Sequence, residues 1–129
     1  MNAHRELFDS VRRRTGMYFP EQTYFVVAAF VLGYDMAHAG GVLAGFREWL
    51  VLRLGMGSNL TWMMLVLHAA FPEESNPHDV VIASPTAQRQ AIDILFDLID
   101  EFHEVRAERD GLRKLFVSYD CWVRQQGIE

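Results

Sequence analysis

The run of apolar residues at positions 24–40 restricts what this chain can fold into more than any other stretch. It reads YFVVAAFVLGYDMAHAG, and the eight successive residues from Phe25 to Leu32 carry no polar side chain. A helix that is apolar all round has no side to turn toward water, so other elements must cover it. The run therefore predicts a buried central helix with further helices packed around it.

The same run has to be distinguished from a membrane-spanning helix, because residues 24–46 approach the ~20 residues that a span needs. Asp35 lies in the middle of this window, and Gly40-Gly41 follows shortly after. A charged side chain at the bilayer centre costs about 2.5–3.5 kcal/mol on the insertion scale, and paired glycines end a helix. These residues favour a buried helix within a bundle, and we expect no membrane partner.

The N-terminal sequence and the cysteine content predict the compartment. The sequence MNAHRELFDS shows no basic segment followed by an apolar one, which a signal peptide would need. Cys121 is the only cysteine, so no disulfide can form within the chain. Both features are typical of a cytoplasmic protein.

Helical periodicity and cap residues predict an all-α fold, with residues 1–129 forming a single-domain bundle of about six helices. Ser84-Pro85 is the clearest start signal, because serine is a good N-cap and proline fits the first helical position. We expect residues 17–20 to be an extended connector, and the β-branched run 80–82 to be a short extended piece. The predicted helices cover residues 4–14, 21 or 23 to 40, 42–54, 58 or 59 to 70, 85–109 and 112–125.

The long helix predicted after Ser84 carries five acidic residues that fall in one sector of its surface. At about 100° per residue they lie opposite the apolar stripe. One interpretation is a docking surface for a basic protein, and the other is an ordinary solvated helix face. We place partner binding on this surface, with the loop 71–79 and its acids Glu73, Glu74 and Asp79 as a second contact. The five residues are Asp93, Asp97, Asp100, Glu101 and Glu104.

Two carboxylate–histidine pairs raise the alternative of a metal site. Asp35 with His38, and Asp100 with His103, have the i, i+3 spacing found in di-metal helical bundles. Such a site needs further inward carboxylates, and nothing in the sequence singles these out. Pairing of Asp35 with a buried helix end or a neighbouring arginine is the better explanation of the spacing. We therefore expect no metal and no cofactor.

The charge balance restricts the class of partner. The chain has 17 acidic and 12 basic residues and a net charge of -5. Proteins that hold nucleic acid usually carry the opposite charge. We expect no nucleic acid partner and favour a basic protein.

Three segments together resemble a known group of proteins. They are VRRRTGMY at 11–18, FVLGY at 30–34 and GFREWL at 45–50. Their order and spacing are similar to those of small bacterial proteins with an Arg-Pro-x-Met-Tyr opening, a Gly-Tyr helix and a Gly-Phe-x-x-Trp helix. Members of this group are presumed immunity proteins of polymorphic toxin systems.

The resemblance implies that the chain is not an enzyme. An immunity protein binds its cognate toxin, here a basic one such as a nuclease, and covers the toxin's active or substrate-binding surface. Two alternatives remain open at this point. One is a metal-dependent helical-bundle enzyme, and the other is a homo-oligomeric regulatory module.

Overall fold

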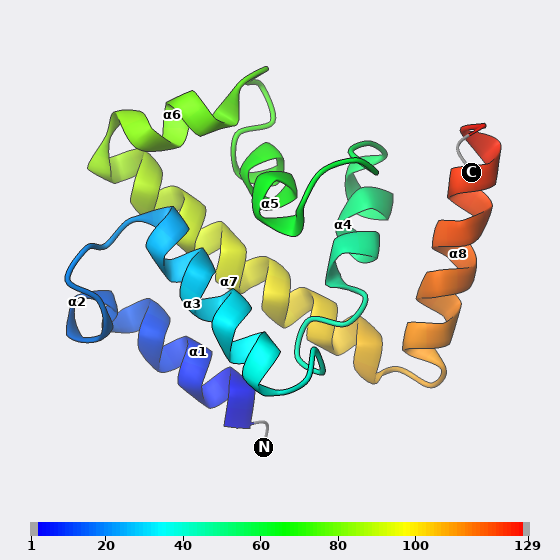
Figure 1. The fold of residues 1–129 in the computed structure, drawn as a ribbon, viewed down its shortest axis with the longest axis horizontal. Helices are drawn as coiled ribbons and strands as arrows, with labels where there is room; N and C mark the ends of the chain where they lie inside the picture. The colour runs from blue at the N-terminus through cyan, green and yellow to red at the C-terminus, as the bar shows by residue number, and fades with distance from the viewer. Residues whose placement is uncertain (1–2, 128–129) are drawn as a thin grey trace.

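The chain forms eight α-helices over residues 3–127, the part that this computed structural model describes (Figure 1). The expected all-α fold is confirmed at that level. The expected count of about six helices is not, because two short helices, α2 and α6, lie where extended segments were predicted. The helices are α1 (Ala3–Arg13), α2 (Thr15–Tyr18), α3 (Tyr24–Ala37), α4 (Phe46–Leu54), α5 (Trp62–Ala70), α6 (Pro77–Ala83), α7 (Pro85–Ala107) and α8 (Gly111–Gln125).

The long helix α7 is the element around which the others are arranged. It runs diagonally through the molecule in Figure 1 and packs against α1, α3, α4, α5, α6 and α8. The Ser84 hydroxyl caps it by accepting a hydrogen bond from Ala87 N at 3.1 Å, as the Ser-Pro signal predicted. The sequence predicted that residues 24–40 form the central helix of the bundle. In the structure α7 lies at the centre instead, so that prediction is not confirmed.

Helix α3 buries only one of its sides. Tyr24, Val27, Ala28 and Val31 are buried, and α3 lies against α7. The opposite side, which includes Met36, is exposed. This helix therefore has an apolar surface that the other described residues, within 3–127, leave exposed.

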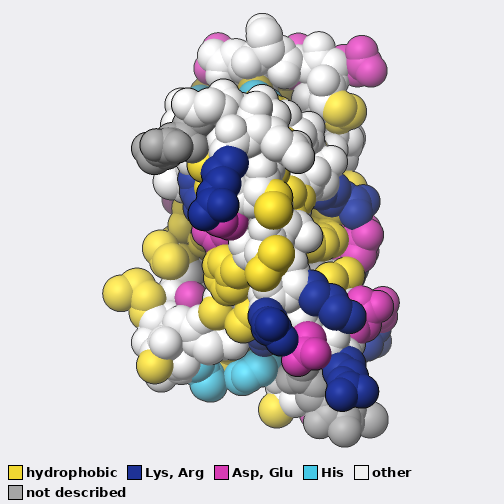
Figure 2. All heavy atoms as spheres, turned by 90° about the vertical axis from the view of Figure 1, so that its right-hand side faces the viewer, with side chains coloured by type: hydrophobic (Ala, Val, Ile, Leu, Met, Phe, Trp, Pro, Cys, Tyr) yellow, Lys and Arg dark blue, Asp and Glu magenta, His cyan; other side chains and the backbone are white. Residues whose placement is uncertain are grey.

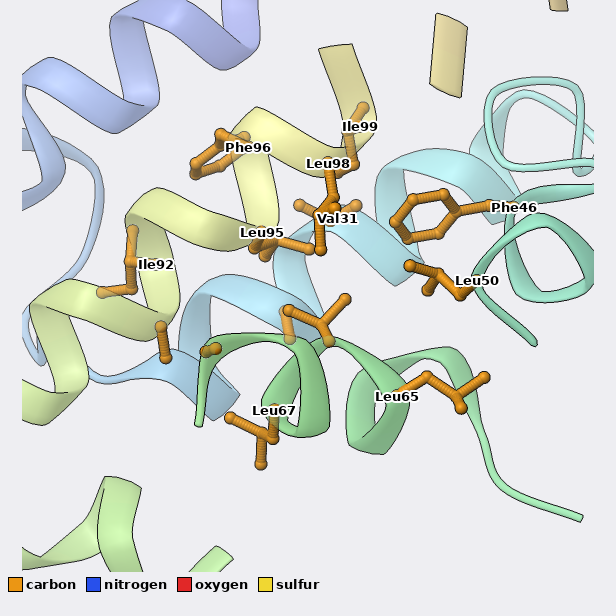
Figure 3. Close-up of a cluster of buried hydrophobic side chains, with 14 of the residues drawn as sticks. Val31, Phe46, Leu50, Leu65, Leu67, Ile92, Leu95, Phe96, Leu98 and Ile99 are labelled. Atoms are coloured by element: carbon orange, nitrogen blue, oxygen red, sulfur yellow. The ribbon is translucent and has the colours of Figure 1, made fainter. Parts of the chain in front are cut away.

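The core fills the space between α7 and the helices on either side of it. Figure 3 shows side chains from α7, such as Leu95 and Leu98, meeting Val31 of α3 and Phe46 and Leu50 of α4. Full burial of such side chains contributes about 1.5–3 kcal/mol each. This packing fixes the position of α7. It therefore also fixes the acidic residues on the side of α7 that points away from this core.

Several predicted elements differ from the structure, among them the predicted loop 71–79, whose last residues belong to α6 (Pro77–Ala83), and the predicted helix 42–54, which begins only at Phe46. Residues 17 and 18 belong to α2 instead of an extended segment, and residues 80–82 lie within α6. Pro77 takes the first position of α6, where its missing N–H is harmless, and Val81 is buried, so packing outweighs the β-branched preference. Residues 42–45 form turns, because Gly45 has φ of +91° and α4 begins only after it.

No helix among residues 3–127 combines the length and the apolar composition that crossing a bilayer requires.

Candidate functional site

Four of the five acids on the outer side of α7, Asp93, Asp97, Asp100 and Glu104, lie near arginines of α1. Arg12 Nη1 is 2.7 Å from the Asp97 carboxylate, and Arg12 Nε is 3.3 Å from that of Asp93. Arg5, two helical turns earlier on α1, lies 3.6 Å from Asp100. The acidic side of α7 is therefore also the surface on which α1 packs.

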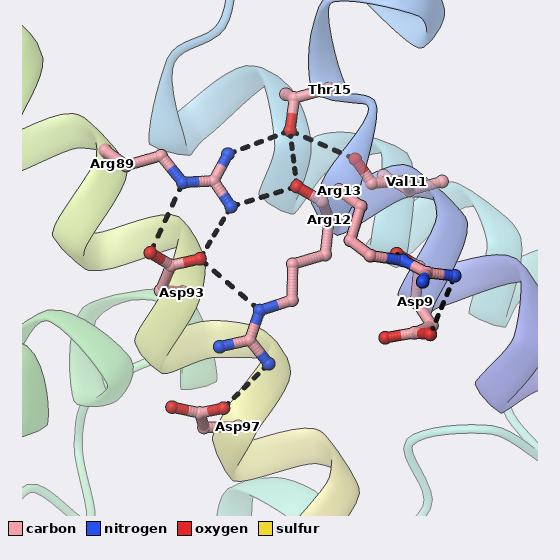
Figure 4. A network of polar contacts seen from close by, with 8 residues as sticks. All are labelled: Asp9, Val11, Arg12, Arg13, Thr15, Arg89, Asp93 and Asp97. Carbon is pink, nitrogen blue, oxygen red and sulfur yellow. Dashed lines mark hydrogen bonds and ion pairs between the residues drawn. The ribbon is translucent and has the colours of Figure 1, made fainter.

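A polar network extends this contact to the start of α2 (Figure 4). Arg89 donates to both carboxylate oxygens of Asp93, at 2.6 and 3.3 Å. It also donates to Thr15 Oγ1 at 3.0 Å and to the carbonyl oxygen of Arg12 at 2.9 Å. The Thr15 hydroxyl is buried and lies 3.0 Å from the carbonyl oxygens of Val11 and Arg12, either of which can accept its proton. One guanidinium of α7 thus holds the junction between α1 and α2.

Asp93 and Asp100 lie at the two ends of the contact between α1 and α7, and their pKa values are shifted in opposite directions. Hydrogen bonds from Arg89 hold the pKa of Asp93 below its usual value against the effect of burial, and Arg12 adds to the lowering. Burial raises the pKa of Asp100, and the charge of Arg5 opposes that rise only in part. The ionised form of Asp93 is therefore stabilised by the fold, while that of Asp100 is disfavoured.

Glu101 and Glu104 of the α7 set are also close to arginines. Glu101 forms an ion pair with Arg53 of α4, on the opposite flank from α1. Glu104 lies 3.9 Å from Arg5. Each of the five residues predicted as a partner surface is therefore within ion-pair distance of an arginine of the same chain.

Sequence reasoning missed these arginine partners. Arg89 and Asp93 have i, i+4 spacing on one helix, which is a signal that the sequence does contain. Arg5, Arg12 and Arg53 are far from their partners in sequence, so only the packing of α1 and α4 against α7 brings them together.

The three acids of the second predicted contact differ from the α7 acids in their surroundings. Glu73 and Glu74 lie exposed between α5 and α6, and Asp79 is exposed on the first turn of α6. Among the described residues, none of the three has an ion pair with a lysine or arginine. Asp79 accepts a hydrogen bond from Asn76 Nδ2 at 3.0 Å and lies 3.6 Å from His78 Nδ1. Figure 2 shows acidic side chains at the top of the molecule, where Figure 1 places this segment.

The aspartate and histidine that were considered as metal ligands hold the turn between α3 and α4 instead. Asp35 Oδ1 accepts hydrogen bonds from Val42 N at 3.0 Å and Leu43 N at 2.8 Å. His103 Nε2 donates to the carbonyl oxygen of Val42 at 2.8 Å, and burial lowers the pKa of this histidine. Both side chains thus bind one short stretch of backbone.

His38 and Asp100, the other members of the two pairs, have different partners. His38 Nδ1 donates to the carbonyl oxygen of Tyr34 at 2.9 Å, while Asp100 faces Arg5. No group of three or more histidine, cysteine, aspartate or glutamate side chains within residues 3–127 is placed to hold a metal ion.

Comparison of the chain with protein families, with curated proteins and with solved structures finds no match in any of the three.

Proposed function

We propose that this chain is an immunity protein that binds a basic toxin domain through the acidic α5–α6 segment. The observation that carries the proposal is the contrast between the two predicted acidic sets. The five acids of α7 lie beside arginines of their own chain, while Glu73, Glu74 and Asp79 have no lysine or arginine partner among the described residues. Of these two sets, the second can meet a basic partner without first breaking an internal ion pair.

The α6 helix adds an apolar side chain to this acidic segment. Ile82 is 56% exposed and follows Asp79 by three residues, so the two lie on the same side of the helix. Tight interfaces commonly combine an apolar anchor that becomes fully buried with a polar or charged rim. Ile82 is the proposed anchor, and the three acids form the rim.

Charge supports a basic partner. The chain carries a net charge of -5, and complementary charge speeds association and selects against partners of the wrong sign. In this proposal Glu101 and Glu104, at the edge of the α7 set, contribute only to the long-range field. The other three α7 acids serve the packing of α1.

The experiment first asks whether a neighbouring gene encodes a toxin domain, and then co-expresses that domain with this chain, scored by survival of the host and by binding of the purified proteins. E73K/E74K should weaken binding about tenfold or more and make it less dependent on salt, because two favourable charges become unfavourable. E21K/E108K is the matched control, because it changes the net charge equally at two exposed acids without ion pairs among the described residues. Equal binding by both variants would overturn the assignment of this surface, and absence of any protection by the wild type would overturn the function.

A further inference from the structure

The α3–α4 turn, residues 38–45 (Figure 1), is held by side chains that lie outside it. Asp35 of α3 accepts two hydrogen bonds from the N–H groups of residues 42 and 43. His103 of α7 donates to the carbonyl oxygen of residue 42 at 2.8 Å, and Arg106 donates to those of residues 41 and 44 at 3.0 and 3.4 Å. Helices α3 and α7 thus hold the α3–α4 turn through side chains that carry or can gain a charge.

Backbone conformation alone does not favour the shape of the α3–α4 turn. Ala39 has φ of +56°, in the left-handed region that a residue with a Cβ rarely adopts. Val42 and Leu43 are buried, so the turn is also held by its own apolar side chains. The left-handed conformation works against closure of the turn, and the buried side chains together with the contacts from α3 and α7 outweigh it.

His103 is the member of this set that can change its charge near neutral pH. Burial lowers the pKa of His103, and its backbone hydrogen bond raises it. The positive charges of Arg106 on α7 and His4 on α1 lower this pKa, while the carboxylate of Asp100 raises it. Asp35, the charged group that faces the turn from α3, stabilises the positive charge of Arg106. The closed turn therefore favours neutral His103.

An open form of the turn takes up a proton more readily than the closed form. Opening brings His103 into contact with water, where a histidine is protonated at a pH of about 6.5. Because the pKa of His103 is lower in the closed turn, the open form binds more protons as the pH falls below about 6.5, and its population rises. This gain ends once the pH has fallen through the lower pKa of the closed form. Opening of one turn costs less free energy than global unfolding, so acid populates the local opening first.

We propose that the α3–α4 turn is an acid-sensitive latch that opens when His103 takes up a proton, while α5, α6 and the start of α7 stay in place. The turn leads directly into α4, and a Cβ on Gly45 would lie 2.7 Å from Leu112 of α8. Opening of the turn therefore also loosens the contact between α4 and α8. The latch does not depend on the proposed immunity function, because the α5–α6 acids make none of the contacts that hold the turn.

Amide hydrogen exchange of the full chain, resolved by NMR and corrected for the intrinsic effect of pH, tests the latch. The amides of Val42 and Leu43 should exchange severalfold faster at about pH 5.5 than at about pH 7.5, because this range spans the ordinary pKa of histidine. The hydrogen-bonded amide of Ala87, at the start of α7, should not change. H103Q should abolish the acid effect, since glutamine can still donate to the Val42 carbonyl oxygen but takes up no proton. H78Q, which removes an exposed histidine of α6, is the matched control and should keep the effect.

Equal exchange of Val42 and Leu43 at both pH values would overturn the proposal. So would an acid effect that H103Q retains, one that H78Q removes, or one that Ala87 shows equally, because the last would mean global unfolding. If H103Q fails to fold, R106Q takes its place. Removal of this neighbouring positive charge should weaken the acid effect, and an unchanged effect would overturn the latch.

Discussion

Arg12 of α1 and Asp97 of α7 form an ion pair with 2.7 Å between Nη1 and Oδ1. This contact changes the interpretation of the acidic residues on α7. They do not face only solvent, because α1 packs on them and supplies two arginines. A helix face that looks like a docking surface in the sequence is in large part an internal contact of the fold.

The strength of this pair can be measured with a double-mutant cycle of R12A and D97A. Arg12 is 25% exposed and Asp97 is 57% exposed, so solvent screens the pair and the coupling energy should be about 0.5 kcal/mol. Denaturant unfolding of the four proteins gives this value. The exposed i, i+4 pair of Asp9 and Arg13 is the control and should show weaker coupling. Additive effects of R12A and D97A would contradict the proposed tie between α1 and α7.

The opposite pKa shifts of Asp93 and Asp100 predict opposite dependences of stability on pH. The pKa of Asp93 is lowered in the folded state, so its contribution is complete above its unfolded value of about 3.9 and is lost as the pH falls through the folded value. D93N should therefore lower the free energy of unfolding at neutral pH, and its difference from the wild type should shrink in acid.

Asp100 provides the matched comparison. Its pKa is raised by burial, so the ionised carboxylate lowers stability at neutral pH and the penalty disappears in acid. D100N should equal or exceed the wild type in stability at neutral pH. Urea unfolding at neutral and acidic pH checks both variants, and equal losses in D93N and D100N at neutral pH would contradict this assignment.

Removal of the Asp35 carboxylate tests whether this residue is structural. D35A leaves the N–H groups of Val42 and Leu43 without their acceptor, which should cost about 1–3 kcal/mol. A chelator should leave the unfolding midpoint of the wild type unchanged, because the role of Asp35 requires no metal. A chelator-sensitive midpoint that D35A abolishes would support the metal-dependent alternative instead.

The buried hydroxyl of Tyr24 should contribute measurably to stability. Tyr24 Oη donates to the carbonyl oxygen of Met63 at 2.6 Å, and burial raises the pKa of this tyrosine. Y24F removes the hydrogen bond between α3 and α5 and should cost about 1 kcal/mol in denaturant unfolding. Y18F is the control, because Tyr18 is exposed and, among the described residues, its hydroxyl has a single hydrogen bond, to Ser10 Oγ at 3.0 Å. Equal stability of the two variants would show that the buried bond contributes nothing.

The helical class and the clearest helix boundaries could be predicted from the sequence because they depend on local signals. Ser84 caps α7 as predicted, and the chain turns between α7 and α8 at residues 108–110, next to the predicted break at Asp110-Gly111. Gly111 has a steric role as well, since a Cβ there would lie 2.9 Å from the carbonyl oxygen of Arg106. Local patterns of this kind need no knowledge of the fold.

The site could be predicted only in part because its electrostatics depend on contacts between distant segments. The five acids of α7 do lie on one side of the helix, but the positions of Arg5, Arg12 and Arg53 follow from packing. The prediction that other helices of this chain surround α3 was not confirmed, for a related reason. An apolar run shows that a helix must be covered, but it does not show whether the same chain or another molecule covers it.

The central claim is that Asp93 and Asp97 of α7 stabilise the fold while the α5–α6 acids are left for a partner. Comparing the free energies of unfolding of D93N/D97N and E73Q/E74Q at neutral pH and low salt tests this claim most directly, because both variants remove two negative charges. We predict a loss of about 1 kcal/mol or more for D93N/D97N and a change within about 0.5 kcal/mol for E73Q/E74Q. Equal losses, or a larger loss in E73Q/E74Q, would contradict the claim.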